Sequence, residues 1–345
     1  MTLKLPGLVP IDYVWQSPLR RVPPPAKTRT VILSAWAKAR LARIVRRAPE
    51  AVVKVKGRTR NAGHLRAHLR YIGRRGAVEL HSQDGLVHRG GEAIDGIVAD
   101  WSSDLALTPA RGRRPETISQ GMILSMPPGT DPQAVLAAAK NFADRQFHNH
   151  DWLIALHTDE KHPHAHLAVR VRGQNGRQLR IGREDLQSLR ERFAEALRER
   201  GVMAEATPRR TRGVSRRAAR TAQHHIGRRG QAPERWRDAT REALQAIGQG
   251  EQAVTPWAQA MRDRQAAHRV LLAAAAEELG RSGAAEDRAL AADVRRYAES
   301  LPEIMTRGEL LTAMLREEAG RRQEAGDNND PGPVDEPPRG RERSR

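Results

Sequence analysis

Hydrophobic and polar positions alternate with two different periods between residues 51 and 207, which predicts interleaved strands and helices. Short apolar or alternating runs predict strands at 51–56, 117–126, 152–156 and 167–171, and a hairpin within 77–91. Helical periodicity predicts helices at 61–75, 92–107, 131–148 and 183–200. Hairpin turns separate several of these elements. We therefore predict an α+β fold with a largely antiparallel central sheet flanked by helices.

The chain outside this region differs in composition, and we predict four parts. A proline-rich arm ends in a basic amphipathic helix at 31–48, which we expect to dock on a neighbouring element or on DNA. After the sheet domain the pattern is basic and almost wholly helical, and the final stretch is polar and rich in proline. The predicted parts are the arm and basic helix 1–48, the sheet domain 49–213, the helical region 214–325 and a disordered tail 326–345.

The stretch LHTDEKHPHAHLAV at 156–169 holds four histidines between two predicted strands. Side chains alternate faces along a strand, so His164 and His166 point the same way. If the two strands form a hairpin, His157 lies opposite His164, at a separation that lets imidazoles share one ion. Three neutral histidines with open positions make a catalytic divalent-metal site. His162 falls in the predicted loop and is left out of this ligand set. The alternative is a polar hairpin with histidines on its wet face.

Composition narrows the range of partners. The chain has a net charge of +19 and only 3% aromatic residues, and such a basic excess favours nucleic acid or an anionic surface. It has no cysteine, which excludes disulfides and thiolate metal sites and fits the cytoplasm. We expect no membrane insertion and no signal peptide, because the N-terminal apolar stretch is broken by Pro6 and Pro10.

A tyrosine in the helix at 61–75 is the candidate nucleophile. His64, His68 and Tyr71 share one helical face, whereas Leu65, Leu69 and Ile72 share another that should pack on the sheet. Arginines at 70, 74 and 75 surround the tyrosine face. A phenol is a weak nucleophile at its ordinary pKa of about 10, so attack on a phosphodiester needs such cations and a base. The alternative is a half-buried tyrosine that anchors the helix.

Three segments in this order resemble the relaxases of conjugative and mobilisable plasmids and of T-DNA transfer, within the HUH endonuclease superfamily. They are HLRYIGRRGAVEL, MILSMPPGTDP and LHTDEKHPHAHLAV, and the histidine pair that gives the superfamily its name is His164-Ala165-His166. The resemblance covers about residues 50–213 and is to relaxases that are like the T-DNA border endonucleases.

The resemblance implies a mechanism. A relaxase nicks one strand at an origin of transfer, forms a 5′-phosphotyrosyl intermediate and later rejoins the strand. It makes Tyr71 the nucleophile and His157, His164 and His166 the metal ligands, with Mg²⁺ or Mn²⁺ as cofactor. Asp159 is the carboxylate that orients a histidine or takes the tyrosine proton. The expected DNA-binding residues are Arg70, Arg74, Arg75, Arg209, Arg210 and Arg212.

The same resemblance implies partners and leaves alternatives open. The expected partners are single-stranded or supercoiled DNA at an origin of transfer, accessory relaxosome proteins and the coupling protein of a type IV secretion channel, through which relaxases travel with the DNA. The helical region 214–325 can bind such partners or be a solvated extension. The alternative functions are a non-catalytic basic DNA-binding protein with structural histidines, a rolling-circle replication initiator, and a metal-dependent hydrolase that uses water.

Overall fold

The computed structural model describes residues 33–107, 117–207, 234–248, 256–305 and 307–327. These residues fall into two compact units, and the first comprises 33–107, 117–207 and 272–299. The second holds the remaining described residues between 234 and 271 and between 300 and 327. The predicted proline-rich arm, the arginines at 209, 210 and 212 and the predicted tail lie outside the described residues.

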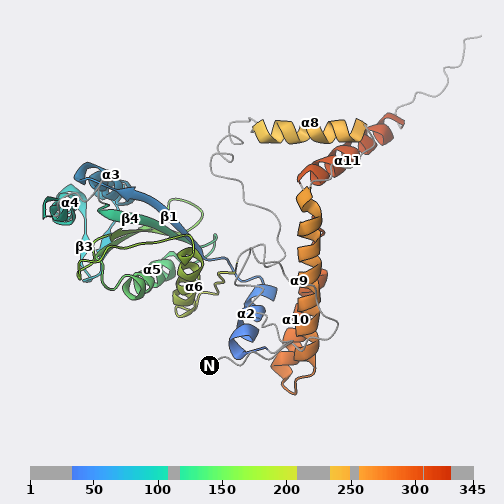
Figure 1. The fold of residues 1–345 in the computed structure, drawn as a ribbon, viewed down its shortest axis with the longest axis horizontal. Helices are drawn as coiled ribbons and strands as arrows, with labels where there is room; N and C mark the ends of the chain where they lie inside the picture. The colour runs from blue at the N-terminus through green and yellow to red at the C-terminus, as the bar shows by residue number, and fades with distance from the viewer. Residues whose placement is uncertain (1–32, 108–116, 208–233, 249–255, 306, 328–345) are drawn as a thin grey trace, which may run out of the picture. The chain divides into compact units, whose positions relative to one another are not determined.

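The first unit is built on a six-stranded sheet in the order β1-β4-β6-β5-β2-β3, and its paired strands run antiparallel (Figure 1). The predicted α+β fold with an antiparallel central sheet is therefore confirmed. In chain order the strands are β1 (Val52–Thr59), β2 (Leu80–Ser82), β3 (Val87–His88), β4 (Ser119–Ser125), β5 (Trp152–His157) and β6 (His164–Arg170).

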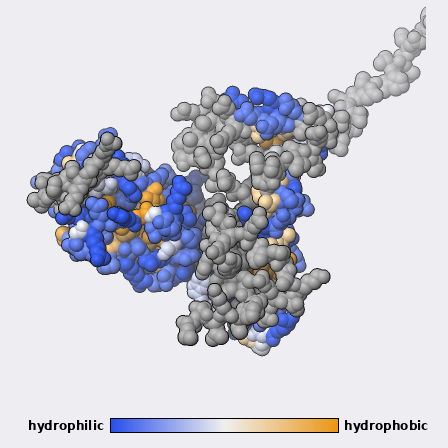
Figure 2. All heavy atoms as spheres, in the orientation of Figure 1, coloured by the Kyte–Doolittle hydropathy of each residue, from blue (hydrophilic) through white to orange (hydrophobic). Residues whose placement is uncertain are grey.

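Helices cover both faces of the sheet, and the alternation of strand side chains creates two apolar cores. On one face α5 (Pro132–Gln146) and α6 (Asp185–Arg198) bury residues such as Leu167 of β6. On the other face α3 (Ala62–Ile72) and α4 (Gly90–Leu107) bury residues such as Ala168. Because side chains alternate, His164 and His166 lie on the face of α3. Hydrophilic residues make up most of the described surface visible in Figure 2.

The helix that carries Tyr71 ends earlier than the sequence predicted. Asn61 caps its start as expected, because the side chain accepts a hydrogen bond from the His64 amide. The helix was predicted to continue to about Arg75, but α3 ends at Ile72. Arg74 and Arg75 have φ angles of 48° and 58°, left-handed values that an α-helix does not contain. A short 3₁₀ turn (Arg74–Gly76) therefore redirects the chain after the tyrosine.

The predicted basic helix is α2 (Ala35–Val45), and its cationic side chains form ion pairs within the protein. Arg40 contacts Glu191 of α6, and Arg43 contacts the buried Glu205. Lys38 and Arg46 contact helix α10 (Ala285–Glu299). We expected this helix to dock on a neighbouring element or on DNA, and in the structure its cationic side chains contact neighbouring elements of the protein. The ion pairs are Lys38–Asp287 at 2.6 Å, Arg40–Glu191 at 3.1 Å, Arg43–Glu205 at 2.8 Å and Arg46–Asp293 at 3.1 Å.

The helical pattern predicted for the C-terminal region is confirmed where the structure describes it. The further helices are α8 (Glu234–Gly248), α9 (Pro256–Gly280) and α11 (Arg307–Asp327), and α8 packs against α11. In the second unit the Gln265 side chain donates to the Pro302 carbonyl at 2.6 Å. Among the described helices, none combines the length and the apolar character needed to cross a membrane.

Candidate active site

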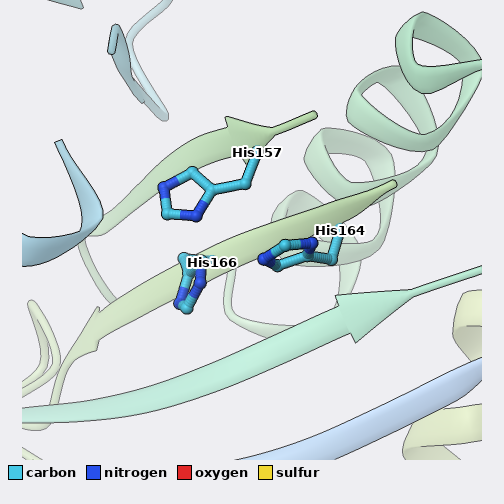
Figure 3. Close-up of side chains that lie close together, drawn as sticks. All are labelled: His157, His164 and His166. Atoms are coloured by element: carbon cyan, nitrogen blue, oxygen red, sulfur yellow. The ribbon is translucent and has the colours of Figure 1, made fainter. Parts of the chain in front are cut away.

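The β5–β6 hairpin brings three of the four clustered histidines together (Figure 3). His157 pairs directly with His164, and His166 follows two residues later on the same face of β6. The ring centroids are 4.4 Å apart for His157 and His166, and 5.2 Å apart for the other two pairs. All three side chains are buried. The predicted register is confirmed, and His162 lies outside strand β6, in the segment between β5 and β6.

The hydrogen bonds of two histidines leave a ring nitrogen of each available for a metal. A carbonyl oxygen only accepts, so His157 donates from Nε2 to the Ile72 carbonyl at 2.6 Å. His164 likewise donates from Nδ1 to the His162 carbonyl at 2.9 Å. Nδ1 of His157 is buried and has no hydrogen-bond partner among the described residues. Metal-binding histidines commonly show this arrangement, in which the second nitrogen is held by a carbonyl.

The electrostatics of the cluster also fit a metal. Burial, followed by the nearby His157 and His164, lowers the pKa of His166 to about 3. Burial also lowers the pKa of His157. Neutral imidazole is the form that binds a metal ion. One nitrogen from each histidine lies within 4.8 Å of the others, so the three residues can hold one divalent ion.

Tyr71 projects from α3 toward this cluster. Leu65, Leu69 and Ile72 are fully buried against the sheet, as predicted, which leaves Tyr71 58% exposed. Its ring lies edge-on to His166, with centroids 5.7 Å apart and planes at 86°. This exposure does not fit a half-buried tyrosine that anchors the helix. The structure instead places a phenol beside the three histidines.

The cations and the carboxylate predicted near Tyr71 differ in what they contact. The Arg74 guanidinium is 5.4 Å from the Tyr71 ring centroid and forms an ion pair with Asp159 at 2.6 Å. Burial opposes ionisation of Asp159, but the charge and hydrogen bond of Arg74, the Asp159 backbone and the charge of His157 together lower the pKa of this carboxyl. Arg70 reaches Asp95 of α4 at 3.6 Å, and Arg75 is exposed. Asp159 thus contacts Arg74, and it also lies close to the histidine cluster.

Sequence reasoning missed two contacts that hold this site together. One is the Ile72 carbonyl that receives His157, which no side-chain pattern reveals. The other is the packing of His68 on Gly121 of β4, where an added Cβ would lie 3.2 Å from the imidazole. A glycine inside a predicted strand is a signal for such a close approach. Gly121 gives this signal within the strand predicted at 117–126, which is β4 in the structure.

Comparison with known proteins shows which family part of this chain is similar to. Residues 91–202 match the family described as relaxase, MobA/VirD2-like, nuclease domain. The resemblance to relaxases that the motifs indicated is therefore confirmed for this part of the chain.

The individual relatives are T-DNA border endonucleases. The VirD2 protein of Rhizobium radiobacter is 28% identical over 194 residues, which cover 51% of this chain and 45% of that protein. The VirD2 protein of Agrobacterium fabrum strain C58 is 27% identical over 203 residues, covering 54% and 45%. The matched part thus spans less than half the length of these relatives. A solved structure from work on the molecular basis of vancomycin resistance transfer in Staphylococcus aureus aligns with 46% of this chain and 99% of its own, at 14% identity and a TM-score of 0.33.

Proposed function

We propose that this protein is a DNA relaxase that nicks one strand at an origin of transfer and later rejoins it. The observation that carries the proposal is the exposed Tyr71 phenol lying edge-on to His166, within a cluster of three buried histidines. The family match over 91–202 supports it, and so do relatives named as border endonucleases. In this proposal 49–213 is the nuclease domain, and the parts predicted on either side of it, 1–48, 214–325 and 326–345, do not take part in the nicking chemistry.

The chemistry is a transesterification that conserves the number of phosphoester bonds. The Tyr71 oxygen attacks the scissile phosphorus, the bond to the 3′ oxygen breaks, and the protein becomes linked to the new 5′ end. The proton lost by the phenol passes to a base, and the departing 3′ oxygen takes up a proton. Because no bond energy is lost to water, attack by a 3′ hydroxyl on the phosphotyrosine reverses the reaction and rejoins the strand.

The histidines and the surrounding charges have separate roles in this scheme. His157, His164 and His166 would hold a divalent ion, which would neutralise charge on the phosphoryl oxygens. We propose Mg²⁺ or Mn²⁺, and an all-imidazole donor set favours Mn²⁺ of the two. Asp159 is the proposed base or positioning carboxylate. It becomes available for the tyrosine proton when Arg74 turns from it to a DNA phosphate.

The remaining proposals concern binding and partners. Arg70, Arg74 and Arg75 contact the DNA backbone near the nick, and Arg209, Arg210 and Arg212 contact it further along. The substrate is single-stranded or supercoiled DNA, handled in the cytoplasm with accessory relaxosome proteins. A type IV secretion coupling protein then receives the relaxase with its covalently bound strand.

The test is a search for the covalent product. The full chain is incubated with Mn²⁺ or Mg²⁺ and single-stranded oligonucleotides that tile the origin region of its own replicon. We expect a protease-sensitive band on a denaturing gel whose DNA-linked peptide contains Tyr71. Tyr71→Phe should bind DNA and lose the band, whereas the control Tyr297→Phe, a buried tyrosine in α10, should keep it. Nicking without an adduct would establish the hydrolase instead, and binding without nicking would establish the non-catalytic DNA-binding protein.

A further inference from the structure

The face of the sheet that carries the histidines continues beyond them to the edge strand β1. The strand register places His166 of β6 opposite Ile123 of β4, and Ile123 opposite Lys54 of β1. Neighbouring strands are about 4.8 Å apart, so the Lys54 backbone lies about 10 Å from that of His166. Figure 3 shows β4 and then β1 (blue) following β6 in the same sheet.

Two lysines of β1 point to this face. Val53 is buried in the core under α5 and α6, and Val55 packs against the same core. Because side chains alternate, Lys54 emerges on the opposite face, which is that of the histidines. Lys56 follows Val55 on the same side, at the start of the β1–β4 register shift between Val55 and Arg58. Both lysines are exposed.

The two ammonium groups also differ from three arginines around α3 in having no acidic partner among the described residues. Within the described part of the chain, neither Lys54 nor Lys56 forms an ion pair, although Arg66, Arg70 and Arg74 around α3 all do. A cation without an internal counter-charge keeps its full attraction for an anionic ligand. An edge strand with outward lysines is also a known protection against strand pairing. However, that role needs no particular face, whereas here both lysines share the face of the histidines.

We infer that Lys54 and Lys56 form a phosphate-binding rail, along which the DNA strand reaches Tyr71 and the histidine cluster. The inference rests on the proposed function and extends it by naming which side of the cluster the strand crosses. A basic groove that follows the backbone is the usual way to bind a single strand. Lysine acts as a point charge without the planar fork of arginine, so the rail positions the strand and does not read its bases.

The experiment measures how binding of a fluorescent oligothymidylate by the full chain depends on salt. Each lost phosphate contact should reduce the slope of log K against log salt by about 0.7 for a single strand. We expect Lys54→Ala/Lys56→Ala to reduce the slope by about 1.4 and to weaken binding. The control Lys140→Ala/Arg145→Ala removes the same charge from α5, on the opposite face of the sheet, and should leave the slope unchanged.

A second measurement uses the absence of cysteine from the chain. Lys56→Cys carrying a photo-crosslinker should capture the oligothymidylate, whereas Lys140→Cys with the same reagent should not. A wild-type slope in the double lysine variant, or equal capture from both cysteines, would overturn the rail while the covalent adduct still forms. If the wild-type chain forms no adduct with origin DNA, the proposed function itself has failed, so the two failures are distinguishable.

Discussion

Replacing Glu205 by glutamine should strongly destabilise the sheet domain, because this carboxylate is the buried centre of a network of donors. Its side chain is 3% exposed and accepts from the Arg43 guanidinium at 2.8 Å. The other oxygen accepts from the Thr207 hydroxyl at 2.7 Å and from the amides of Ala206 and Thr207 at 2.9 and 3.1 Å. Arg40, also buried, lies 3.7 Å away.

The magnitude follows from these contacts. A glutamine keeps the shape but offers one acceptor and one NH₂ group, so either amide orientation leaves donors facing donors. Breaking a buried ion pair by removing one charge typically costs about 3–5 kcal/mol. We expect Glu205→Gln to lose about 3 kcal/mol, since Arg40 retains a second partner in Glu191. Glu191→Gln is the matched control. Its side chain is 43% exposed, so its loss should be at most about 1 kcal/mol.

Urea titrations of the full chain at pH 7, followed by circular dichroism, measure both variants. Burial opposes ionisation of Glu205, but the hydrogen bonds from Thr207 and Arg43 outweigh it and lower the pKa of this carboxyl. The stability it contributes is therefore present above the unfolded-state pKa of about 4.3 and is lost as pH falls through the lower folded pKa. Equal losses in the two glutamine variants, or a loss under about 1 kcal/mol for Glu205→Gln, would refute the reasoning.

Three further predictions concern the packing, the metal and the pH. Gly121→Ala should lower stability by about 1 kcal/mol in thermal melts, because its Cβ meets His68 at 3.2 Å, whereas Gly57→Ala has open space and should not. Mn²⁺ at about 100 times its Kd should raise stability by about 2.7 kcal/mol, and the same rise in His166→Ala would contradict the metal site. Burial lowers the pKa of His268 to about 4, so the stability it contributes is present above about 6.5 and is lost as pH falls toward 4. Between pH 7.5 and 5 the loss should be about 2 kcal/mol, and His268→Leu should flatten this dependence in urea titrations.

The histidine cluster was predictable because a strand has a period of two. Once residues 152–156 and 167–171 are taken as paired strands, the short loop leaves few registers, and an apolar core fixes one of them. A one-residue slip would turn Leu167 to the face of α3 and α4 and His166 into the core under α5 and α6. The observed pairing of His157 with His164 is the register that avoids this.

The contacts around Tyr71 were not predictable in the same way, because they depend on backbone groups and on partners far along the chain. Arg74 and Asp159 are 85 residues apart, and each alone suggested a solvated charge or a catalytic role. The left-handed backbone at Arg74 and Arg75 falls on two arginines between Gly73 and Gly76, where residue type does not predict it. The surface on which α2 docks could not be predicted for the same reason. A basic helix suits either DNA or acidic protein groups, and only the folded chain shows that Asp287 and Glu205 are near.

The position of Tyr71 depends on its backbone as much as on its helix face. The residue after it, Ile72, is fully buried, and its carbonyl accepts the hydrogen bond of His157 at 2.6 Å. The following turn brings Arg74 over the Tyr71 ring and ties it to the segment between β5 and β6 through Asp159. The end of α3 is therefore fixed to the histidine hairpin by a backbone contact and an ion pair, on either side of Gly73. Because His157 is both a cluster histidine and the donor to Ile72, the phenol and the histidines are held by one rigid connection. The proposed attack of the Tyr71 oxygen on a phosphate would need such preorganisation.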